Sequence, residues 1–298
     1  MHPFGRTVKV GTFANVCQSS ISCAHCGEMV TFYDTHAHLT FPDFEDEIPA
    51  LVERAQAAGI TRIVTIGTDL DSSLRAVQLA EMYEAIYAVV GWHPNDLKTA
   101  PNDVREDLRP LCVHPKVVAV GETGLDYYRL PSNEGGSEAD DEDWKTKQEE
   151  IFRQQLELAV EQKLNVVIHQ RAALESTLAI FEQYADRVSG QFHCFVDDVT
   201  SMQRVTNMGS LVSYTGIATF KNAKDVREAI NATPLDKLML ETDSPFLAPV
   251  PYRGKRCEPA FTRHVAEVVA EVKGVSLDEL SESTCATAHA FFPKLKSS

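Results

Sequence analysis

Eight short apolar runs, each followed by a segment with helical periodicity, recur along the chain. The runs are continuous rather than alternating, which is typical of strands whose two faces are both buried. They occupy residues 30–33, 61–67, 86–91, 116–121, 165–168, 190–192, 211–214 and 237–240. Strands that alternate with helices indicate an α/β fold with a parallel sheet. Eight such repeats predict closure into a single (β/α)8 TIM barrel, which typically takes about 250 residues.

The segments outside this alternation of strands and helices define the predicted domain organisation. Residues 1–28 show no sustained periodicity, so we expect a disordered N-terminal extension there. Residues 29–298 are assigned to the barrel domain. Near the end of the chain, Ser276 and Glu279 form a capping-box pattern, which predicts an extra C-terminal helix.

Two local patterns make further predictions. Residues 131–143 are glycine-rich and acidic, which favours a solvated loop before a long helix over 145–163, with a negatively charged flap near the site as the alternative. Asp71 is placed to act as the N-cap of a helix over 71–83, because an aspartate side chain accepts hydrogen bonds from the first free backbone N–H groups of a helix.

Charge and cysteine content narrow the functional classes. A formal net charge of −15 argues against broad electrostatic binding to nucleic acid, although it permits a local site where bound metal ions supply positive charge. Seven irregularly spaced cysteines do not form a disulfide framework, so we expect reduced thiols and a cytoplasmic protein. No apolar run reaches the roughly 18 residues of a membrane span, and residues 1–28 lack the apolar core of a secretory signal.

Side chains with metal-ligand chemistry follow one predicted strand after another. In a (β/α)8 barrel, the carboxyl ends of the strands form the active site. An isolated His-x-His pair, or a single histidine at a strand end, is commonly only structural. Here five histidines and two carboxylates occupy equivalent positions, and this coincidence predicts a metal site. They are His36, His38, His93, Glu122, His169, His193 and Asp243.

The size of this ligand set favours two ions over one. Six nitrogen and oxygen ligands exceed the needs of one four-coordinate zinc ion, but they suit two divalent ions that share a carboxylate. Glu122 is the candidate bridge. His36, His38 and Asp243 would complete the shell of one ion, and His169 and His193 that of the other. The mixed ligands permit Zn, Mn or Mg.

This ligand set also indicates a reaction class. Two such ions activate a water and stabilise an anionic leaving group, which predicts hydrolysis of an ester, an amide or a phosphoester. Asp243 is placed to accept a proton from the attacking water. The residues alone are compatible with hydrolysis of an ester, an amide or a phosphoester.

Six motifs, in this order, resemble the TatD family of metal-dependent deoxyribonucleases over about residues 29–292. They are Asp34-Thr35-His36-Ala37-His38-Leu39, Gly91-Trp92-His93-Pro94, Gly121-Glu122-Thr123-Gly124-Leu125-Asp126-Tyr127, Ile168-His169-Gln170-Arg171, Phe192-His193-Cys194-Phe195 and Glu241-Thr242-Asp243-Ser244-Pro245. The resemblance implies an amidohydrolase-like barrel that binds two divalent ions. It also implies hydrolysis of DNA phosphodiester bonds, usually from the 3′ end and with a preference for single strands.

The resemblance also suggests roles for individual residues. It implies the same six metal ligands, with Asp243, Glu122 and His93 as the catalytic residues and His93 close to the scissile phosphate or its water. Arg171, Arg253 and Arg256 are expected to contact phosphates, because a guanidinium matches the oxygens of a phosphate. For the two loop arginines, Arg253 and Arg256, ordinary solvated surface is the alternative.

Some positions depart from the family pattern and leave the substrate open. Cys257 stands where the family usually has an asparagine, and Thr287 stands at another frequent asparagine. A hydrolase of a small ester, a lactone, an amide or aminoacyl-tRNA on the same scaffold is the first alternative, because a fold does not dictate its substrate. A barrel that only binds a partner is the second. The sequence leaves the oligomeric state open, with a monomer as the expectation.

Overall fold

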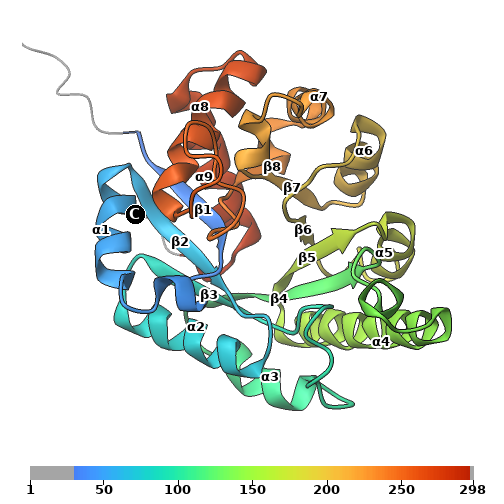
Figure 1. Ribbon diagram of the computed structural model, residues 1–298. Coiled ribbons are helices and arrows are strands. Elements are labelled where there is room, and N and C mark those ends of the chain that lie inside the picture. Colours follow the sequence, from blue (N-terminus) through green and yellow to red (C-terminus); the bar gives the residue numbers. More distant parts are fainter. Residues whose placement is uncertain (1–29, 296–298) are drawn as a thin grey trace, which may run out of the picture.

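The computed structural model describes residues 30–295, and its core is one sheet of eight parallel strands in the order β1 to β8 (Figure 1). The strands are β1 (Phe32–Ala37), β2 (Ile60–Ile66), β3 (Ile86–Val90), β4 (Val117–Asp126), β5 (Asn165–Arg171), β6 (Gly190–Phe192), β7 (Leu211–Tyr214) and β8 (Leu238–Leu240). Just past β8, Ser244 forms a parallel bridge with Ala37, which brings the two edges of the sheet together. The predicted (β/α)8 barrel is therefore confirmed.

Helices lie between successive strands and surround the barrel (Figure 1). They are α1 (Ile48–Ala57), α2 (Leu70–Met82), α3 (Arg105–Cys112), α4 (Glu138–Gln162), α5 (Leu174–Phe181), α6 (Val199–Asn207), α7 (Lys224–Ala232) and α8 (Thr262–Lys273). The extra C-terminal helix is confirmed as α9 (Leu277–Phe291). Its N-cap is Ser276, whose hydroxyl accepts from the backbone N–H of Glu279 over 3.1 Å.

Helix α9 and the residues after it close one end of the barrel. Phe291 and Phe292 pack in an apolar cluster with Val64, Val118 and Val167, which point into the barrel. This end lies at the amino side of the strands, because Asn165, the first residue of β5, donates from its amide to the carbonyl of Phe291 over 2.6 Å. The carboxyl ends of the strands are left for the polar side chains.

The acidic segment differs from its prediction. Helix α4 begins at Glu138 rather than near residue 145, so the predicted loop over 131–143 is wrong in its second half. The first half contains a 3-10 turn (Pro131–Glu134). The carboxylate of Asp141 is buried and accepts from the backbone and the hydroxyl of Ser132, over 2.8 and 2.7 Å. Acidic side chains at a helix start favour the helix, because they complement its positive N-terminus.

Two further boundaries are corrected. The N-cap of α2 is Asp69 rather than Asp71, because Asp69 forms a reciprocal capping box with Ser72. Strand β1 continues to Ala37, so it includes His36. The predicted disorder of residues 1–28 lies outside the described residues. Within residues 30–295, no helix combines the length and the apolar character that crossing a membrane requires.

Candidate metal centre

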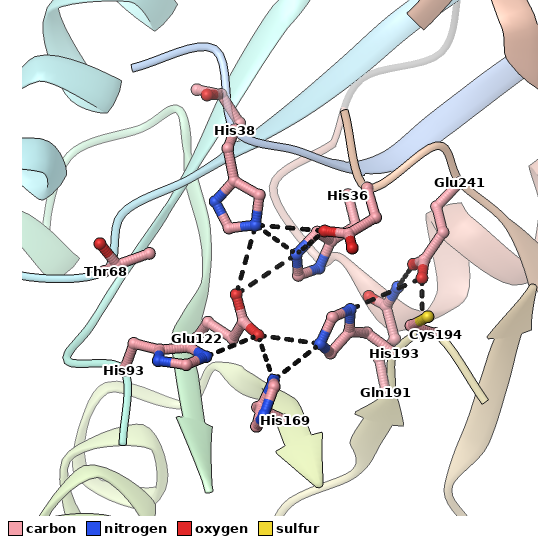
Figure 2. A network of polar contacts seen from close by, with 12 residues as sticks. His36, His38, Thr68, His93, Glu122, His169, Gln191, His193, Cys194 and Glu241 are labelled. Atoms are coloured by element: carbon pink, nitrogen blue, oxygen red, sulfur yellow. Dashed lines mark hydrogen bonds and ion pairs between the residues drawn. The ribbon is translucent and has the colours of Figure 1, made fainter. Parts of the chain in front are cut away.

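The carboxylate of Glu122, on β4, lies at the centre of the polar side chains at the carboxyl ends of the strands (Figure 2). It is 1% exposed. Its Oε1 atom lies 2.9 Å from His169 Nδ1 and 2.8 Å from His193 Nε2. Its Oε2 atom faces the other way, 3.4 Å from His36 Nε2 and 3.6 Å from His38 Nε2. The two carboxylate oxygens therefore face different histidines.

The first donor set is formed by β1 and the segment that follows β8. His36 and His38 lie two residues apart, so they point to the same side of the chain. Their Nε2 atoms are 3.3 Å apart, and both face Asp243 Oδ1, at 3.6 and 3.2 Å. Asp243 has a φ of 57°, a left-handed backbone conformation that costs energy for a residue with a side chain. The structure thus brings these three predicted ligands close together.

The second donor set lies on β5 and just past β6. His169 Nδ1 and His193 Nε2 are 3.3 Å apart and share Glu122 Oε1. His93, which follows β3, also faces this oxygen, with its Nε2 at 3.4 Å. His93, Glu122 and His169 converge closely enough to hold an ion, so this histidine lies beside the second set.

The chemistry of these residues fits bound divalent cations. Oε2 of Glu122 is buried and accepts no hydrogen bond among the described residues, which is costly for a charged oxygen. Pairs of imidazole nitrogens face each other and the same carboxylate oxygens. Mixed imidazole and carboxylate donors are typical ligands of zinc and manganese. A cation among these atoms would satisfy each of them.

The electrostatics of the cluster follow from burial and from opposite charge. Burial by itself would raise the pKa of Glu122, but His193, His93 and His36 together hold that pKa well below its usual range. The pKa of Asp243 is also lowered, against its burial, by the facing His38 and His36. Both groups are therefore carboxylates at neutral pH, as metal binding requires.

The histidines divide into two groups by the direction of their pKa shift. Burial, and for His36 also the neighbouring His193, lowers the pKa of His36 and His93 and favours their neutral rings. Burial also disfavours the charged form of His169 and His193, but nearby carboxylates reverse the shift. Asp126 and Glu122 raise the pKa of His169, and Glu122 and Glu241 raise that of His193 well above its usual value.

Three buried carboxylates that are not among the predicted site residues contact the proposed ligands or the backbone next to them. Asp126 Oδ2 lies 3.3 Å from His169 Nε2, on the far side of the ring from Glu122. Glu241 lies 3.6 Å from His193 Nδ1 and accepts from the backbone N–H of Cys194 over 2.6 Å. Such partners fix the orientation of ligand rings. All three lie inside the quoted motifs, so their position beside the ligands was the available signal.

Asp34 is the third of these carboxylates. It precedes His36 by two residues and accepts from the backbone and the hydroxyl of Thr242, over 3.0 and 2.6 Å. Burial raises the pKa of Asp34 to about 8. Because Thr242 lies next to Asp243, these bonds hold β1 and the chain after β8 in register.

A cavity of about 600 Å³ opens above the cluster. His38, His93, His169, His193 and Asp243 lie at its polar base. Its other walls combine polar and charged side chains, such as Arg129 and Arg171, with apolar ones, such as Phe41 and Leu247. Phe246 lies on its wall and is half exposed. The volume falls within the range of small-molecule and cofactor sites, roughly 300–1,000 Å³.

The structure places one of the three predicted phosphate-binding arginines in this cavity. Arg171 lines it, with its guanidinium 3.9 Å from the ring centre of Tyr128. Arg253 stacks on Phe220 instead, and Arg256 forms an ion pair with Glu47 over 2.8 Å, and neither lines the cavity. Arg129, which is not among the predicted phosphate-binding residues, does line it.

Comparison with known proteins agrees with this geometry. Residues 33–293 match the family model described as TatD related DNase. The chain is 38% identical to an uncharacterized metal-dependent hydrolase, YabD, of Bacillus subtilis, over 87% of this chain and 98% of that protein. It is 30% identical to the 3′-5′ ssDNA/RNA exonuclease TatD of Klebsiella pneumoniae, over 87% of this chain and 97% of that protein.

A solved structure shows the same fold. The TatD homologue YjjV of Escherichia coli superposes with a TM-score of 0.81 at 28% identity, over 89% of this chain and 99% of that one. The family match covers most of the described barrel, including every proposed ligand. The chain therefore belongs to the TatD-related DNase family and is a metal-dependent hydrolase.

Proposed function

We propose that this protein is a metal-dependent deoxyribonuclease that removes nucleotides from the 3′ end of single-stranded DNA. The observation that carries the proposal is the position of Glu122, whose two carboxylate oxygens face separate sets of histidines. A carboxylate shared in this way suits two divalent ions, a common arrangement in nucleases and phosphatases. The exonuclease name of the Klebsiella relative supports the direction and the strand preference.

The ligands divide between two ions, whose identity is Mg, Mn or Zn. His36, His38 and Asp243 would hold one, His169 and His193 the other, and Glu122 would bridge them. Two such ions supply Lewis acidity toward a water and toward the oxygens of a scissile phosphate.

The other roles follow from the protein's own atoms. Asp243, whose side chain is 14% exposed, reaches the cavity as a carboxylate, and it would accept a proton from the attacking water. The backbone N–H of Asn95 donates to His93 Nδ1 over 3.1 Å, so the neutral ring carries its proton on Nε2. The Nε2–H group of His93 faces the cluster and would donate a hydrogen bond to a phosphate oxygen.

A strand end, rather than a duplex, fits the charge of this protein. A net charge of −15 opposes the approach of a long polyanion along the surface. Arg171 offers a guanidinium at the cavity itself. Arg253 and Arg256, which lie outside the cavity, would contact only a strand that continues beyond it. The proposed location is the cytoplasm, supported by four free cysteines in the described chain, and the proposed state is a monomer.

Digestion of end-labelled single-stranded DNA tests this proposal. The full-length protein would be incubated with Mg²⁺, with Mn²⁺ and with a chelator, beside Asp243→Ala. We expect a metal-dependent ladder that recedes from the 3′ end and is absent in the variant. A label at each end in separate reactions gives the direction.

The alternatives give different results in the same assay. The apolar side chains on the cavity wall, such as Phe41, Ile217 and Leu247, would also accept a small ester, lactone or amide. An aminoacyl-tRNA end is the other substrate to try. Intact DNA in every lane, with metal binding verified by elemental analysis, would contradict the nuclease proposal. Hydrolysis of one of those substrates would then support a hydrolase with a different substrate. If none of them is hydrolysed, the result would support a barrel that only binds a partner.

A further inference from the structure

A second cavity of about 340 Å³ adjoins the cavity above the metal ligands. It lies between the segment after β3 and the start of α4. Asn95, Asp96 and Arg129 line both cavities, so the two share a wall. Lys98 and Trp144 line only the second. A molecule that extends from the metal centre past Arg129 would enter this space.

Internal bonds hold the walls of the second cavity in place. Asn95 donates from its amide to Asp126 Oδ2 over 2.9 Å, and the same oxygen faces His169. Asp141 near the start of α4 fixes the 3-10 turn that contributes Pro131. The Lys147 ammonium donates to a carbonyl of the segment after β3 over 2.6 Å. The shared wall is thus tied to a metal ligand, and the opposite wall to α4.

The side chains on these walls offer a cation and an aromatic face. Among the described side chains, no carboxylate lies within 4.0 Å of the Arg129 guanidinium. On the rest of this acidic surface, arginines such as Arg54 and Arg109 pair with carboxylates. Asp96 also lines both cavities, and burial raises the pKa of its carboxyl group. Trp144 is half-buried.

We propose that the second cavity binds the nucleotide next to the one held at the metal centre. Arg129, on the shared wall, would contact the phosphate that joins the two nucleotides. The neighbouring base would stack on Trp144, as bases do on aromatic side chains in proteins that bind single strands. Lys98 adds positive charge to the lining of this cavity. This inference rests on the proposed nuclease function and specifies its substrate as a strand of at least two nucleotides.

Tryptophan fluorescence provides a direct test, because the chain has two tryptophans and Trp92 is 4% exposed. The Mg²⁺-equilibrated full-length protein would be titrated with thymidine monophosphate and with a thymidine dinucleotide that carries a phosphorothioate linkage. We expect quenching by the dinucleotide and much less by the mononucleotide. Equal quenching by both ligands, or none by either, would contradict the second subsite.

Variants separate the proposed contacts from general effects on folding. Trp144→Ala should weaken dinucleotide binding about tenfold, in line with the measured effect of losing one stacked base, while Trp144→Phe should largely retain it. Arg129→Gln should weaken the dinucleotide more than the mononucleotide. Arg153→Gln is the matched control. Arg153 lies on α4, as Trp144 does, but it is hydrogen-bonded to Gln183 and lines neither cavity, so this variant should bind like the wild type. For the variants without Trp144, displacement of a fluorescent oligonucleotide replaces the intrinsic signal.

The test also distinguishes this inference from the proposed function. If labelled DNA is not cleaved while the dinucleotide quenches Trp144, the subsite stands and the nuclease proposal fails. If DNA is cleaved while Trp144→Ala and Arg129→Gln bind and cleave dinucleotides as well as the wild type, the nuclease proposal stands and the subsite is wrong.

Discussion

The backbone N–H of Asp243 donates to the carbonyl of His36 over 2.9 Å. In the opposite direction across the same two segments, the backbone N–H of His38 donates to the carbonyl of Ser244 over 2.7 Å. These two bonds join the first strand to the chain after the last strand. The seam that closes the barrel therefore also sets the separation of three proposed metal ligands, His36, His38 and Asp243, so their geometry depends on complete folding.

Replacement of Asp243 by asparagine should remove hydrolysis without unfolding the barrel. The backbone bond to His36 remains, but the side chain loses its charge and its ability to accept a proton. Loss of a positioned acid or base typically costs about 10²–10⁴-fold in rate, and loss of a ligand adds to this. Turnover and metal content would be measured together.

Asp236→Asn is the matched control, because Asp236 lies in the turn before β8 and away from the cavity. It should retain wild-type turnover and metal content. Full activity in Asp243→Asn would contradict the role assigned to this carboxylate.

Replacement of Asp126 by asparagine should weaken metal binding although Asp126 is not a proposed ligand. Its carboxylate accepts from the far nitrogen of His169, which orients the ring toward Glu122. Loss of such a partner typically reduces metal affinity or activity about 10–100-fold. Metal affinity would be measured by competition with a chelator.

Asp198→Asn provides the comparison, since Asp198 caps α6 at the surface and asparagine is also a good N-cap. Its metal affinity should equal that of the wild type. If Asp126→Asn also binds metal with unchanged affinity, Asp126 serves the structure rather than the site.

The clustering of the proposed ligands was predictable because their placement follows from local rules. A strand end is visible as the end of an apolar run, and side chains two residues apart, such as His36 and His38, share one side of a strand. The barrel topology then brings Glu122 and His193 together without further information, since parallel strands carry all their carboxyl ends on the same rim.

The remaining features depend on contacts that no local rule fixes. Arg256 pairs with Glu47, 209 residues away, only because the loop after β8 folds beside α1. Asp69 rather than Asp71 caps α2 because Ser72 completes its capping box, which requires the backbone angle at residue 69. The second cavity depends on where α4 starts, and that start lies seven residues before the predicted one.

Replacement of Gly124 by alanine should damage the metal centre through the backbone. Gly124 has a φ of 134°, and an added Cβ would lie 2.0 Å from the carbonyl oxygen of His169. Strands β4 and β5 would have to separate, which displaces a ligand. We expect a loss of folding stability above the roughly 1–3 kcal/mol of a strained backbone alone, together with weaker metal binding.

Gly274→Ala is the control that separates the effect of backbone strain from that of steric overlap. Gly274 ends α8 with a φ of 67°, and an added Cβ would meet no heavy atom within 4 Å. It should lose about 1 kcal/mol of stability from the left-handed conformation and keep its metal affinity. Equal losses in the two variants, measured by urea denaturation and chelator competition, would show that close approach to His169 is not what requires glycine at 124.

A buried thiol should make stability depend on pH in the alkaline range. Cys112 is 1% exposed, and burial raises the pKa of its thiol to about 12, above the value of roughly 8.5 in an unfolded chain. The folded state therefore holds its proton more tightly. Its contribution to stability is complete below about pH 8.5 and is lost as the pH rises toward 12, with a limiting slope of about 1.4 kcal/mol per pH unit.

The difference between the wild type and Cys112→Ala isolates this effect, because other titrating groups are common to both. At pH 7.5 the variant should be less stable by about 1 kcal/mol through lost packing. That difference should shrink above pH 8.5 and reverse its sign by about pH 10, since only the wild type has a thiol to titrate and its stability falls by about 2 kcal/mol over that range. Urea denaturation at four pH values measures it, and a difference that stays constant over this range would mean that the thiol of folded Cys112 ionises as readily as in the unfolded chain.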